Sequence, residues 1–343
     1  MGEYKWEFRY GPYGSAYQLL AIDTEESIIA HWGLLPHYLR VGKELLKSGK
    51  QENAMCDTKY RGKGIYLNFQ KKCIKMAWDE GYEVAWTSLS PAAQVHRKAG
   101  FQSLGEMTNV IWLINNNILV TFYRFLACAF SILFSYRKLI FILKNLHQAL
   151  KLHKNKIRRS HKVYFSLVSF DETQIRDFIK IWKQQRQHKP NLYSVTLERD
   201  YSYIIWRFFD NPYVSYNWNT IIDKNGIPCG YVVWHRLMTT VYLDDLIFLN
   251  KYFTTESIQN VLTCLSKIRE FRKGLIVKFL TLRPSPIFNM LIGSGFSYKS
   301  RGTNNLKTHL QIYVSPQLDF ETANTLSKPE KWYVSRIFSE GLS

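Results

Sequence analysis

The sequence has few cysteines, and their spacing provides neither a disulfide framework nor a metal site. The five cysteines are widely separated, none forms a CxxC pair, and no histidine lies at the spacing of a zinc ligand. Residues 1–14 lack the apolar run of a secretory signal, and Trp6 stands where a myristoylation signal has Ser or Thr. We therefore expect a reducing, cytoplasmic environment, no disulfides and no bound metal.

Acidic residues are also scarce, and their distribution is uneven. The 343-residue chain has 46 Lys and Arg against 27 Asp and Glu, which gives a formal net charge of +19 at pH 7. From Met107 to Phe170 there is no acidic residue. The same stretch has ten basic residues: Arg124, Arg137, Lys138, Lys144, Lys151, Lys154, Lys156, Arg158, Arg159 and Lys162. Such an excess favours an anionic partner: a phosphorylated cofactor, nucleic acid or an acidic membrane surface.

Long apolar runs are missing as well. Residues 118–134 are almost continuously apolar but contain Arg124, and they are shorter than the roughly 20 residues of a transmembrane helix. Two interpretations of a basic apolar linker at 116–162 stay open. It is either a helix packed at the junction between domains or an amphipathic helix on the anionic inner face of a membrane. Nucleic-acid binding by 151–162 is not expected, because no groove-reading residues lie nearby.

Alternating strands and helices flank this linker on both sides. A hydrophobic fraction of 46% supports globular cores, and at roughly 150 residues per domain the length predicts two domains. The first half is predicted to contain strands at 17–22, 28–35 and 39–46, a helix at 65–80, a strand at 82–89, a helix at 91–99 and one or two strands in 101–113. The second half repeats this order, with a strand at 163–170, a helix at 172–185, strands at 216–222, 230–235 and 243–249, a helix at 257–272, a strand at 275–282 and a helix at 286–293. Each half ends its short helix in Gly-Phe, so we expect a tandem repeat of one α/β unit.

The most informative segment is residues 56–66, CDTKYRGKGIY, where a strand ends in a glycine-bearing turn that opens into a helix. The first N–H groups of a helix lack internal partners and lie at the positive end of its dipole, so they bind anions. The turn supplies two glycines and three cations: Gly62, Gly64, Lys59, Arg61 and Lys63. The spacings of a Walker loop and of a GxGxxG dinucleotide motif are both absent. We therefore expect a phosphate-binding turn of another kind.

This turn resembles the motif of the GNAT family of acyl-CoA-dependent N-acyltransferases. The family has Arg or Gln, two residues, Gly, one residue, and then Gly or Ala, and these positions hold Arg61, Gly64 and Tyr66. Tyr66 departs from the motif. A bulky residue at this position is associated with family branches from surface-polysaccharide loci, so the chain resembles a tandem protein of that type.

A second segment, residues 88–101, resembles a later block of the family. Ala92, Gly100 and Phe101 match this block, whereas Leu89 replaces the usual Asn and His96 replaces the usual Tyr. The turn, helix, strand, short helix and Gly-Phe also follow one another in the order of the family. The resemblance covers residues 16–113 and extends more faintly over 163–314. It implies an α/β protein of two tandem GNAT-like domains, each a mixed twisted sheet flanked by helices.

Site residues follow from the resemblance. It implies that the thioester lies between two splayed strands and that backbone amides hold the acyl oxygen and the pyrophosphate. The implied cofactor-binding residues are Met55, Cys56, Arg61, Gly62, Lys63, Gly64, Ile65 and Tyr66. Glu52 and Asp57 are the candidate bases for the attacking ammonium, and His96 is the candidate acid for the CoA thiolate. In the alternative interpretation Asp57 caps the turn, Glu52 is an exposed strand residue and His96 is a partly exposed helix residue.

The second copy lacks these features. Residues 249–255 enter the helix without a glycine, and Leu291 occupies the position equivalent to His96, so we do not expect CoA to bind there. Candidates for an acceptor groove in this half are Asp244, Asp245, Trp206, Arg207, Trp234 and His235, although core packing is the competing interpretation for the aromatics. Only sixteen residues precede the strand at 17–22, so the first copy is expected to lack the first strand and helix of the family fold.

The predicted domains are 1–115, the linker 116–162, 163–316 and a tail at 317–343. The predicted function is transfer of an acyl group, with acetyl-CoA as the expected donor, to an amine, with an amino sugar as one candidate acceptor. Peripheral contact with a membrane through 118–162 is a further expectation. Two other functions stay open: a non-catalytic, membrane-associated binding protein with a degenerate fold, and a peptidoglycan aminoacyl-transferase that uses charged tRNA.

Overall fold

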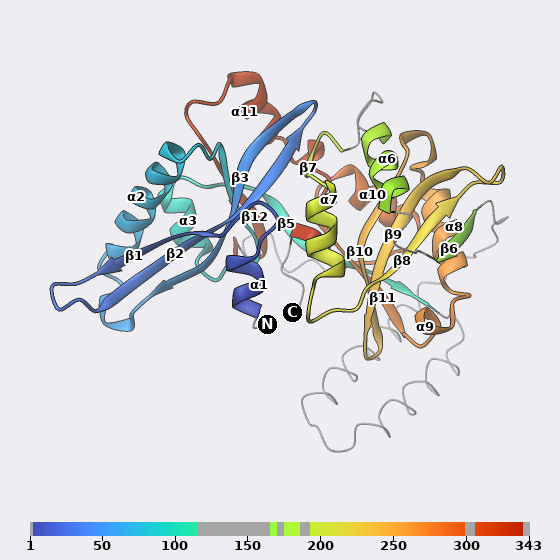
Figure 1. Ribbon diagram of the computed structural model, residues 1–343, viewed down its shortest axis with the longest axis horizontal. Helices are drawn as coiled ribbons and strands as arrows, with labels where there is room; N and C mark the ends of the chain where they lie inside the picture. The colour runs from blue at the N-terminus through green and yellow to red at the C-terminus, as the bar shows by residue number, and fades with distance from the viewer. Residues whose placement is uncertain (1–2, 115–164, 170–174, 186–192, 299–305, 339–343) are drawn as a thin grey trace, which may run out of the picture.

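The structure is a computed structural model that describes residues 3–114, 165–169, 175–185, 193–298 and 306–338, and the strands of these residues form one sheet of twelve (Figure 1). The first half contributes β1 (Tyr17–Ile22), β2 (Ile28–Val41), β3 (Glu44–Cys56), β4 (Val84–Thr87) and β5 (Gln102–Leu113). The second half contributes β6 (Ser166–Ser169), β7 (Val195–Leu197), β8 (Asn217–Ile222), β9 (Pro228–Leu237), β10 (Thr240–Phe248), β11 (Ile276–Arg283) and β12 (His309–Val314). The order across the sheet is β1-β2-β3-β4-β12-β5-β11-β10-β9-β8-β6, and β7 pairs with β2.

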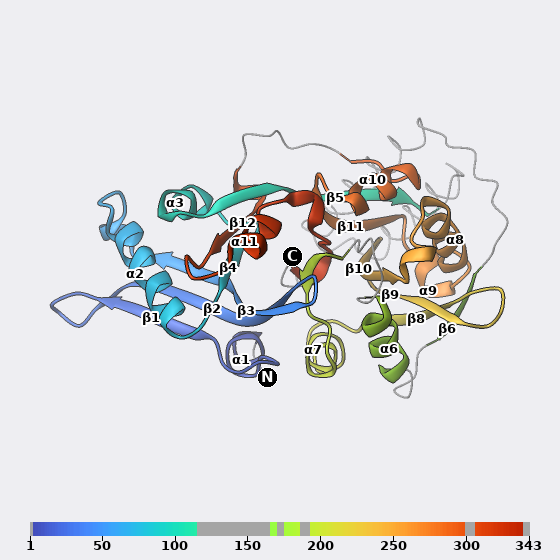
Figure 2. The same cartoon turned by 90° about the horizontal axis from the view of Figure 1, so that it is seen from above.

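Helices cover both faces of the sheet (Figure 2). One face carries α1 (Glu3–Arg9), α6 (Ile175–Gln185) and α7 (Tyr201–Ile204). The other face carries α2 (Ile65–Asp79), α3 (Ala93–Ala99), α8 (Thr255–Leu265) and α10 (Pro286–Gly293). Two further short helices are α9 (Arg269–Arg272) and α11 (Phe320–Leu326). The predicted α/β fold, a mixed sheet flanked by helices, is therefore confirmed.

Two of the predicted elements are wrong in detail. Residues 39–46 do not form a strand of their own, because a two-residue turn at Gly42 and Lys43 divides them between β2 and β3. Gly42 has a φ of +57°, which glycine adopts without steric cost. Residues 257–272 are not one helix, because Ile268 is extended and separates α8 from α9.

The two halves exchange strands. β12, the last strand of the second half, lies between β4 and β5 of the first half and pairs antiparallel with both. In return β5 pairs antiparallel with β11, from Glu106 opposite Arg283 to Leu113 opposite Ile276. Each half therefore completes the sheet of the other. The domain limits given above stay a prediction, and the linker at 116–162 lies outside the described residues.

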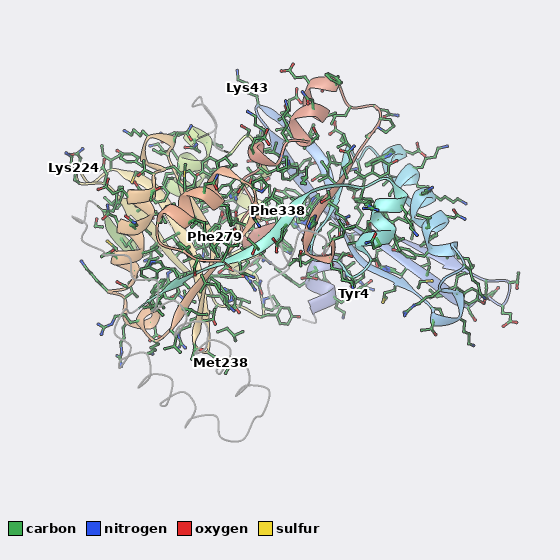
Figure 3. All side chains as sticks on the ribbon, turned by 180° about the vertical axis from the view of Figure 1, so that it is seen from behind. Tyr4, Lys43, Lys224, Met238, Phe279 and Phe338 are labelled. Carbon is green, nitrogen blue, oxygen red and sulfur yellow. The ribbon has the colours of Figure 1, made fainter. Side chains whose placement is uncertain are left out.

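One hydrophobic core spans the junction between the halves. Its members include Trp86 and Leu104 of the first half and Leu243 and Val277 of the second. The C-terminal segment adds Phe338, which lies near the middle of the molecule (Figure 3) and packs against Trp86 with 5.2 Å between ring centroids. The buried members of a smaller core beneath α2 all come from the first half, and Tyr313 of β12 packs against them. The shared core joins the halves into one packed unit.

The edge of the first half is covered in part by the second. Before β1 the described residues form helix α1 and no strand. β7 pairs with Leu39–Val41, the end of β2 that β1 does not reach. A strand from the second half thus protects part of an otherwise open edge.

Both halves contain the same side-chain anchor, which supports the internal repeat. In the first half Asp23 accepts hydrogen bonds from Glu25 N, Ser27 N and the hydroxyl of Tyr60. In the second half Asp223 accepts the corresponding hydrogen bonds from Asn225 N, Ile227 N and the hydroxyl of Tyr252. In each copy the tyrosine bond ties the short helical turn after a strand, β3 or β10, to an earlier β-hairpin turn, between β1 and β2 or between β8 and β9.

Candidate active site

The parallel strands β3 and β4 separate after a short paired region. Their pairing runs from Ser48 opposite Val84 to Lys50 opposite Trp86, whereas β3 continues to Cys56. Beyond Lys50, no described strand pairs with this edge of β3. The structure therefore shows the splayed strands that the resemblance implied.

A bulge in β3 accompanies the separation. His31 of β2 lies opposite Met55, and Gly33 lies opposite Glu52, so β3 has one more residue than β2 in this interval. Asn53 has a φ of +51°, and its carbonyl oxygen accepts a hydrogen bond from Nδ1 of His31 at 2.8 Å. A bulge bends and twists the strand that carries it, which turns the end of β3 away from β4.

Backbone direction at the end of β3 makes Cys56 a candidate oxyanion donor. The N–H of Asp57 donates to Ile29 O of β2 at 2.9 Å, and Cys56 lies directly opposite Ala30. Successive N–H groups of a strand point to opposite edges, so the N–H of Cys56 points away from β2 toward the unpaired edge. The carbonyl of Cys56 points in the same direction and accepts a hydrogen bond from Nε of Arg61 at 2.9 Å.

The glycine turn opens directly into α2. Gly62 and Gly64 both have a φ of +76°, and Gly64 is the N-cap of the helix. Among the described residues, no backbone or side-chain acceptor takes a hydrogen bond from the N–H groups of 62–66. Gly62, Lys63 and Gly64 are exposed. The start of α2 therefore presents free amide donors at the positive end of a fifteen-residue helix.

The side chains around the turn leave these amides accessible. Tyr66 points inward, because its hydroxyl is buried near Gln51 of β3 and burial raises its pKa. Arg61 and Lys63 are exposed; Arg61 reaches back to the end of β3, and the ammonium of Lys63 lies 5.7 Å from the ring centroid of Tyr60. Ile65 is half-buried and Met55 is 59% exposed. Tyr66 thus fills the space under the helix and not the outer face of the turn.

The two candidate bases occupy different environments. Glu52 is half-buried on β3, and its Oε1 lies 2.5 Å from Nζ of the buried Lys50. Asp57 is exposed, and its Oδ1 accepts the N–H of Lys59 at 2.8 Å, so it caps the short helical turn at Thr58–Tyr60. Glu52 is the carboxylate beside the separating strands, and Asp57 has a clear structural use in the turn.

His96 lies inside the protein, with no exposed surface. Its Nδ1 is 2.9 Å from the amide nitrogen of Gln70, and its Nε2 is 2.9 Å from Oγ of Ser90. Burial lowers the pKa of His96 to about 4, and the charge of Glu52 opposes this shift. The structure thus brings Glu52 and His96 into one neighbourhood, and it keeps the imidazole neutral near pH 7.

Three polar residues near the site were not predicted. Gln51, Gln70 and Ser90 connect the end of β3 to α2 and α3, because Gln70 Nε2 also lies 3.2 Å from Oε1 of Gln51. Gln70 carried a signal in the sequence, since it occupies the apolar stripe of α2 that continues at Cys73 and Ala77. A polar residue in such a stripe indicates a buried partner. Ser90 carried no comparable signal.

The second copy has no equivalent site in its described residues. Thr254, and not a glycine, caps α8, and its side chain accepts the N–H of Ser257. Asp245 is bound by Arg199 in a buried ion pair, and Asp244 is bound by His235 and Arg336. These two predicted groove residues therefore have structural partners.

The aromatic candidates of the second half are also packed. Trp206 stacks on Trp6 with 4.5 Å between ring centroids, and Trp234 donates to Oδ1 of Asn219. Trp234 lines a cavity of about 680 Å³ near β6, β8 and the end of α8, away from the separation of β3 and β4. Arg207 is buried and lies close enough to affect the pKa of His37.

Two further findings concern the described residues only. No group of three or more His, Cys, Asp or Glu side chains within them is arranged to hold a metal ion. None of their helices combines the length and apolar character that crossing a membrane requires.

Comparisons with known proteins agree with this architecture. No protein-family model and no curated protein matches the chain. A GCN5-related N-acetyltransferase from Anabaena variabilis has a TM-score of 0.57 at 12% identity, over 87% of this chain and 62% of its own. A probable N-acyltransferase from Enterococcus faecalis has a TM-score of 0.56 at 8% identity, with the same two coverages. Eis1 from Mycobacterium abscessus has a TM-score of 0.51 at 13% identity, over 91% of this chain and 67% of its own.

The first two of these structures are longer proteins, and the chain spans about three fifths of their length. At this level of identity the similarity concerns the fold. The splayed strands, the glycine turn before α2 and the mixed sheet agree with it. The chain therefore has the fold of the GCN5-related N-acetyltransferases.

Proposed function

We propose that the chain is an acyl-CoA-dependent N-acyltransferase whose first half binds the cofactor and carries out the reaction. The observation that supports this most directly is the run of unpartnered N–H groups at 62–66, at the start of α2 and beside the separation of β3 and β4. Such a turn fits a diphosphate, because it offers several donors at the positive end of a helix without side chains in the way. The structural neighbours named as N-acetyltransferases and N-acyltransferase support the same reaction class.

The residues of the first half would have separate roles in cofactor binding, stabilisation of the acyl oxygen and proton transfer. The amides of 62–66 would hold the pyrophosphate of CoA, and Lys59, Arg61 and Lys63 would add positive charge. The N–H of Cys56 would donate to the acyl oxygen, whose negative charge grows as the amine attacks. Glu52 would accept the proton of the attacking ammonium, directly or through water, and Met55 would contact the pantetheine arm.

The finer identity of the substrates is part of the proposal. We propose acetyl as the acyl group and an amine as the acceptor, with an amino sugar as the first class to test. The proposal that the basic linker meets an anionic membrane also stands as a prediction, because 116–162 lies outside the described residues. Anionic vesicles should then co-sediment the protein, and high salt should reduce this.

Calorimetric titration with acetyl-CoA tests the central proposal. The parent protein should bind with a Kd in the micromolar range (about 8 kcal/mol). Gly64→Glu should abolish binding, because a carboxylate would project from the amide donors that the diphosphate needs. Gly226→Glu is the matched control: Gly226 has a φ of +79° and open space around it, like Gly64, but it lies in a turn of the second half.

Two outcomes would contradict the proposal. If the parent protein does not bind acetyl-CoA, the non-catalytic function or the tRNA-dependent function is favoured, and binding of aminoacyl-tRNA separates these two. If Gly64→Glu binds acetyl-CoA as tightly as the parent, the cofactor does not rest on the glycine turn.

A further inference from the structure

One polar group near the separation of β3 and β4 that the predicted site did not include is the hydroxyl of Ser90. It follows β4 by three residues. The carboxyl ends of parallel strands meet at the same edge of a sheet, so Ser90 and Cys56 lie at the same edge, one after each of the separating strands. Ser90 is half-buried, whereas His96 behind it is fully buried. A substrate therefore meets Ser90 before it can meet His96.

The orientation of the Gln70 amide, whose nitrogen faces Nδ1 of His96, indicates the direction of the Ser90 proton. The amide of Gln70 donates to Nδ1 of His96, which leaves the hydrogen of the neutral ring on Nε2. Nε2–H then donates to Oγ of Ser90 at 2.9 Å, and the N–H of Ala92 donates to the same oxygen at 3.1 Å. Both acceptor sites of the hydroxyl are occupied. In the described part of the chain no group accepts its proton, so the O–H is directed outward.

The backbone before Ser90 is held in an uncommon conformation. Leu89 has a φ of +55° and a side chain that is 40% exposed. A branched or bulky residue rarely adopts this region, which costs about 1 kcal/mol or more and is found preferentially at functional sites. At Leu89 the chain turns away from the direction of β4, and this turn places the hydroxyl of Ser90 within hydrogen-bond distance of His96.

We propose, on the basis of the function proposed above, that Ser90 is a catalytic hydrogen-bond donor to the sulfur of the departing CoA thiolate and that His96 is the positioning residue that aims it. The C–S bond breaks and its electron pair stays on sulfur. The hydroxyl stabilises this charge and keeps its own proton, while the proton of the attacking amine goes to Glu52 or water. The neutral ring of His96 is well suited to orienting the hydroxyl and poorly suited to giving up a proton.

The experiment measures binding and turnover separately. Binding of acetyl-CoA is measured by calorimetry, and turnover is followed as CoA release with hydroxylamine, a small nucleophile that does not depend on an acceptor groove. Ser90→Ala should lower kcat by about 100-fold, the usual effect of removing one preorganised donor, and leave the Kd for acetyl-CoA within about twofold of the parent. Ser90→Thr, which keeps a hydroxyl, should restore most of the activity.

His96 has its own pair of variants. His96→Gln places an amide nitrogen near the position of Nε2 and should retain most of kcat, whereas His96→Asn does not reach Ser90 and should lose it. The matched control is Ser103→Ala, because Ser103 also pairs with a histidine, Nδ1 of His309 at 2.6 Å, but lies exposed on β5. It should not change kcat. In the parent, kcat should show no loss between about pH 6 and pH 8 from titration of His96.

The outcomes distinguish this inference from the proposed function. Failure of the parent to bind acetyl-CoA removes the function, and the inference with it. Normal binding together with an unchanged kcat in Ser90→Ala overturns the inference alone. Loss of both binding and turnover in Ser90→Ala, without rescue in Ser90→Thr, would show a purely structural role and would also overturn it. Thermal unfolding of each variant establishes that the chain is folded in the assay.

Discussion

Burial keeps two histidines of the first half neutral, and each has a different environment. His96 has partners on both ring nitrogens. His37 has no described partner for Nδ1 and lies among aromatic rings, with Trp86 at 5.7 Å and Tyr203 at 6.1 Å between ring centroids. Burial lowers the pKa of His37 to about 3, and the positive charges of Lys50 and Arg207 add to this effect.

This shift predicts a pH dependence of stability. The folded-state pKa of His37 lies below its unfolded value of about 6.5, so its contribution is complete above that value and is lost as the pH falls toward 3. Between pH 7 and pH 5 the parent should lose about 2 kcal/mol more unfolding free energy than His37→Phe, which cannot titrate. Urea unfolding at both pH values measures the difference, and equal losses would contradict it. Between pH 7 and pH 8 the two proteins should behave alike.

The backbone of the glycine turn could be predicted from the sequence, whereas the surroundings of His96 could not, for physical reasons. The turn at Gly62 and Gly64 was predictable because a left-handed backbone before a helix favours glycine, and the structure has both residues at a φ of +76°. The burial of His96 was not predictable, because its partners Gln70 and Ser90 come from a different helix and from a loop. The predicted roles of Glu52, Asp57 and His96 stay predictions.

At the scale of elements, β5 depends on a close approach that only glycine allows. Gly105 lies opposite Leu310 of β12, next to an irregularity in that pairing, and the neighbouring Glu106 lies opposite Arg283 of β11. Its φ is +144°, and a Cβ atom at this position would lie 2.2 Å from the carbonyl oxygen of Arg283. The glycine therefore permits β5 of the first half to lie between β12 and β11 of the second half.

Gly105→Ala should destabilise the protein strongly. The methyl group would collide with backbone, which moves less readily than a side chain, so we expect a loss of about 3 kcal/mol or more in unfolding free energy. Gln102→Ala is the control on the same strand, because Gln102 is exposed and should change stability by no more than about 0.5 kcal/mol. Chemical denaturation of both variants is the measurement, and similar midpoints would show that β5 can move aside.

Element order was predictable and element pairing was not. Local patterns in the sequence predicted strands within 101–113 and at 275–282, but they did not predict β12. The alternation of buried and exposed residues in a strand is the same whichever strand lies beside it. Nothing in the pattern of β5 or β12 could therefore reveal that they exchange halves. The turn inside 39–46 was overlooked, although Gly42 followed by Lys43 offered a hairpin signal.

For the whole molecule, the exchanged strands and the shared core predict a single cooperative unfolding transition. Ile312 of β12 is 1% exposed and belongs to the core that spans both halves. Ile312→Ala should cost about 2–5 kcal/mol and lower the stability of both halves together. Hydrogen exchange in rising urea, followed by mass spectrometry, should show peptides from β2 and β9 losing protection at the same concentration.

A split result would contradict this prediction. If peptides from β2 lose protection in Ile312→Ala while peptides from β9 keep it, the halves fold independently in spite of their common sheet. Ile22→Ala provides the control, because Ile22 is 60% exposed at the outer edge of the sheet and should leave the transition unchanged.

The position of β12 also has a consequence for synthesis. A ribosome makes residues 84–113 long before residues 309–314, yet β4 and β5 are separated by the later strand in the finished sheet. During translation the edges of β4 and β5 that pair with β12 in the finished sheet remain unpaired, and unpaired strand edges can pair wrongly with other chains. The sheet around β4 and β5 is therefore completed only after β12 has been made, so a nascent chain that stalls earlier lacks the strand that joins them.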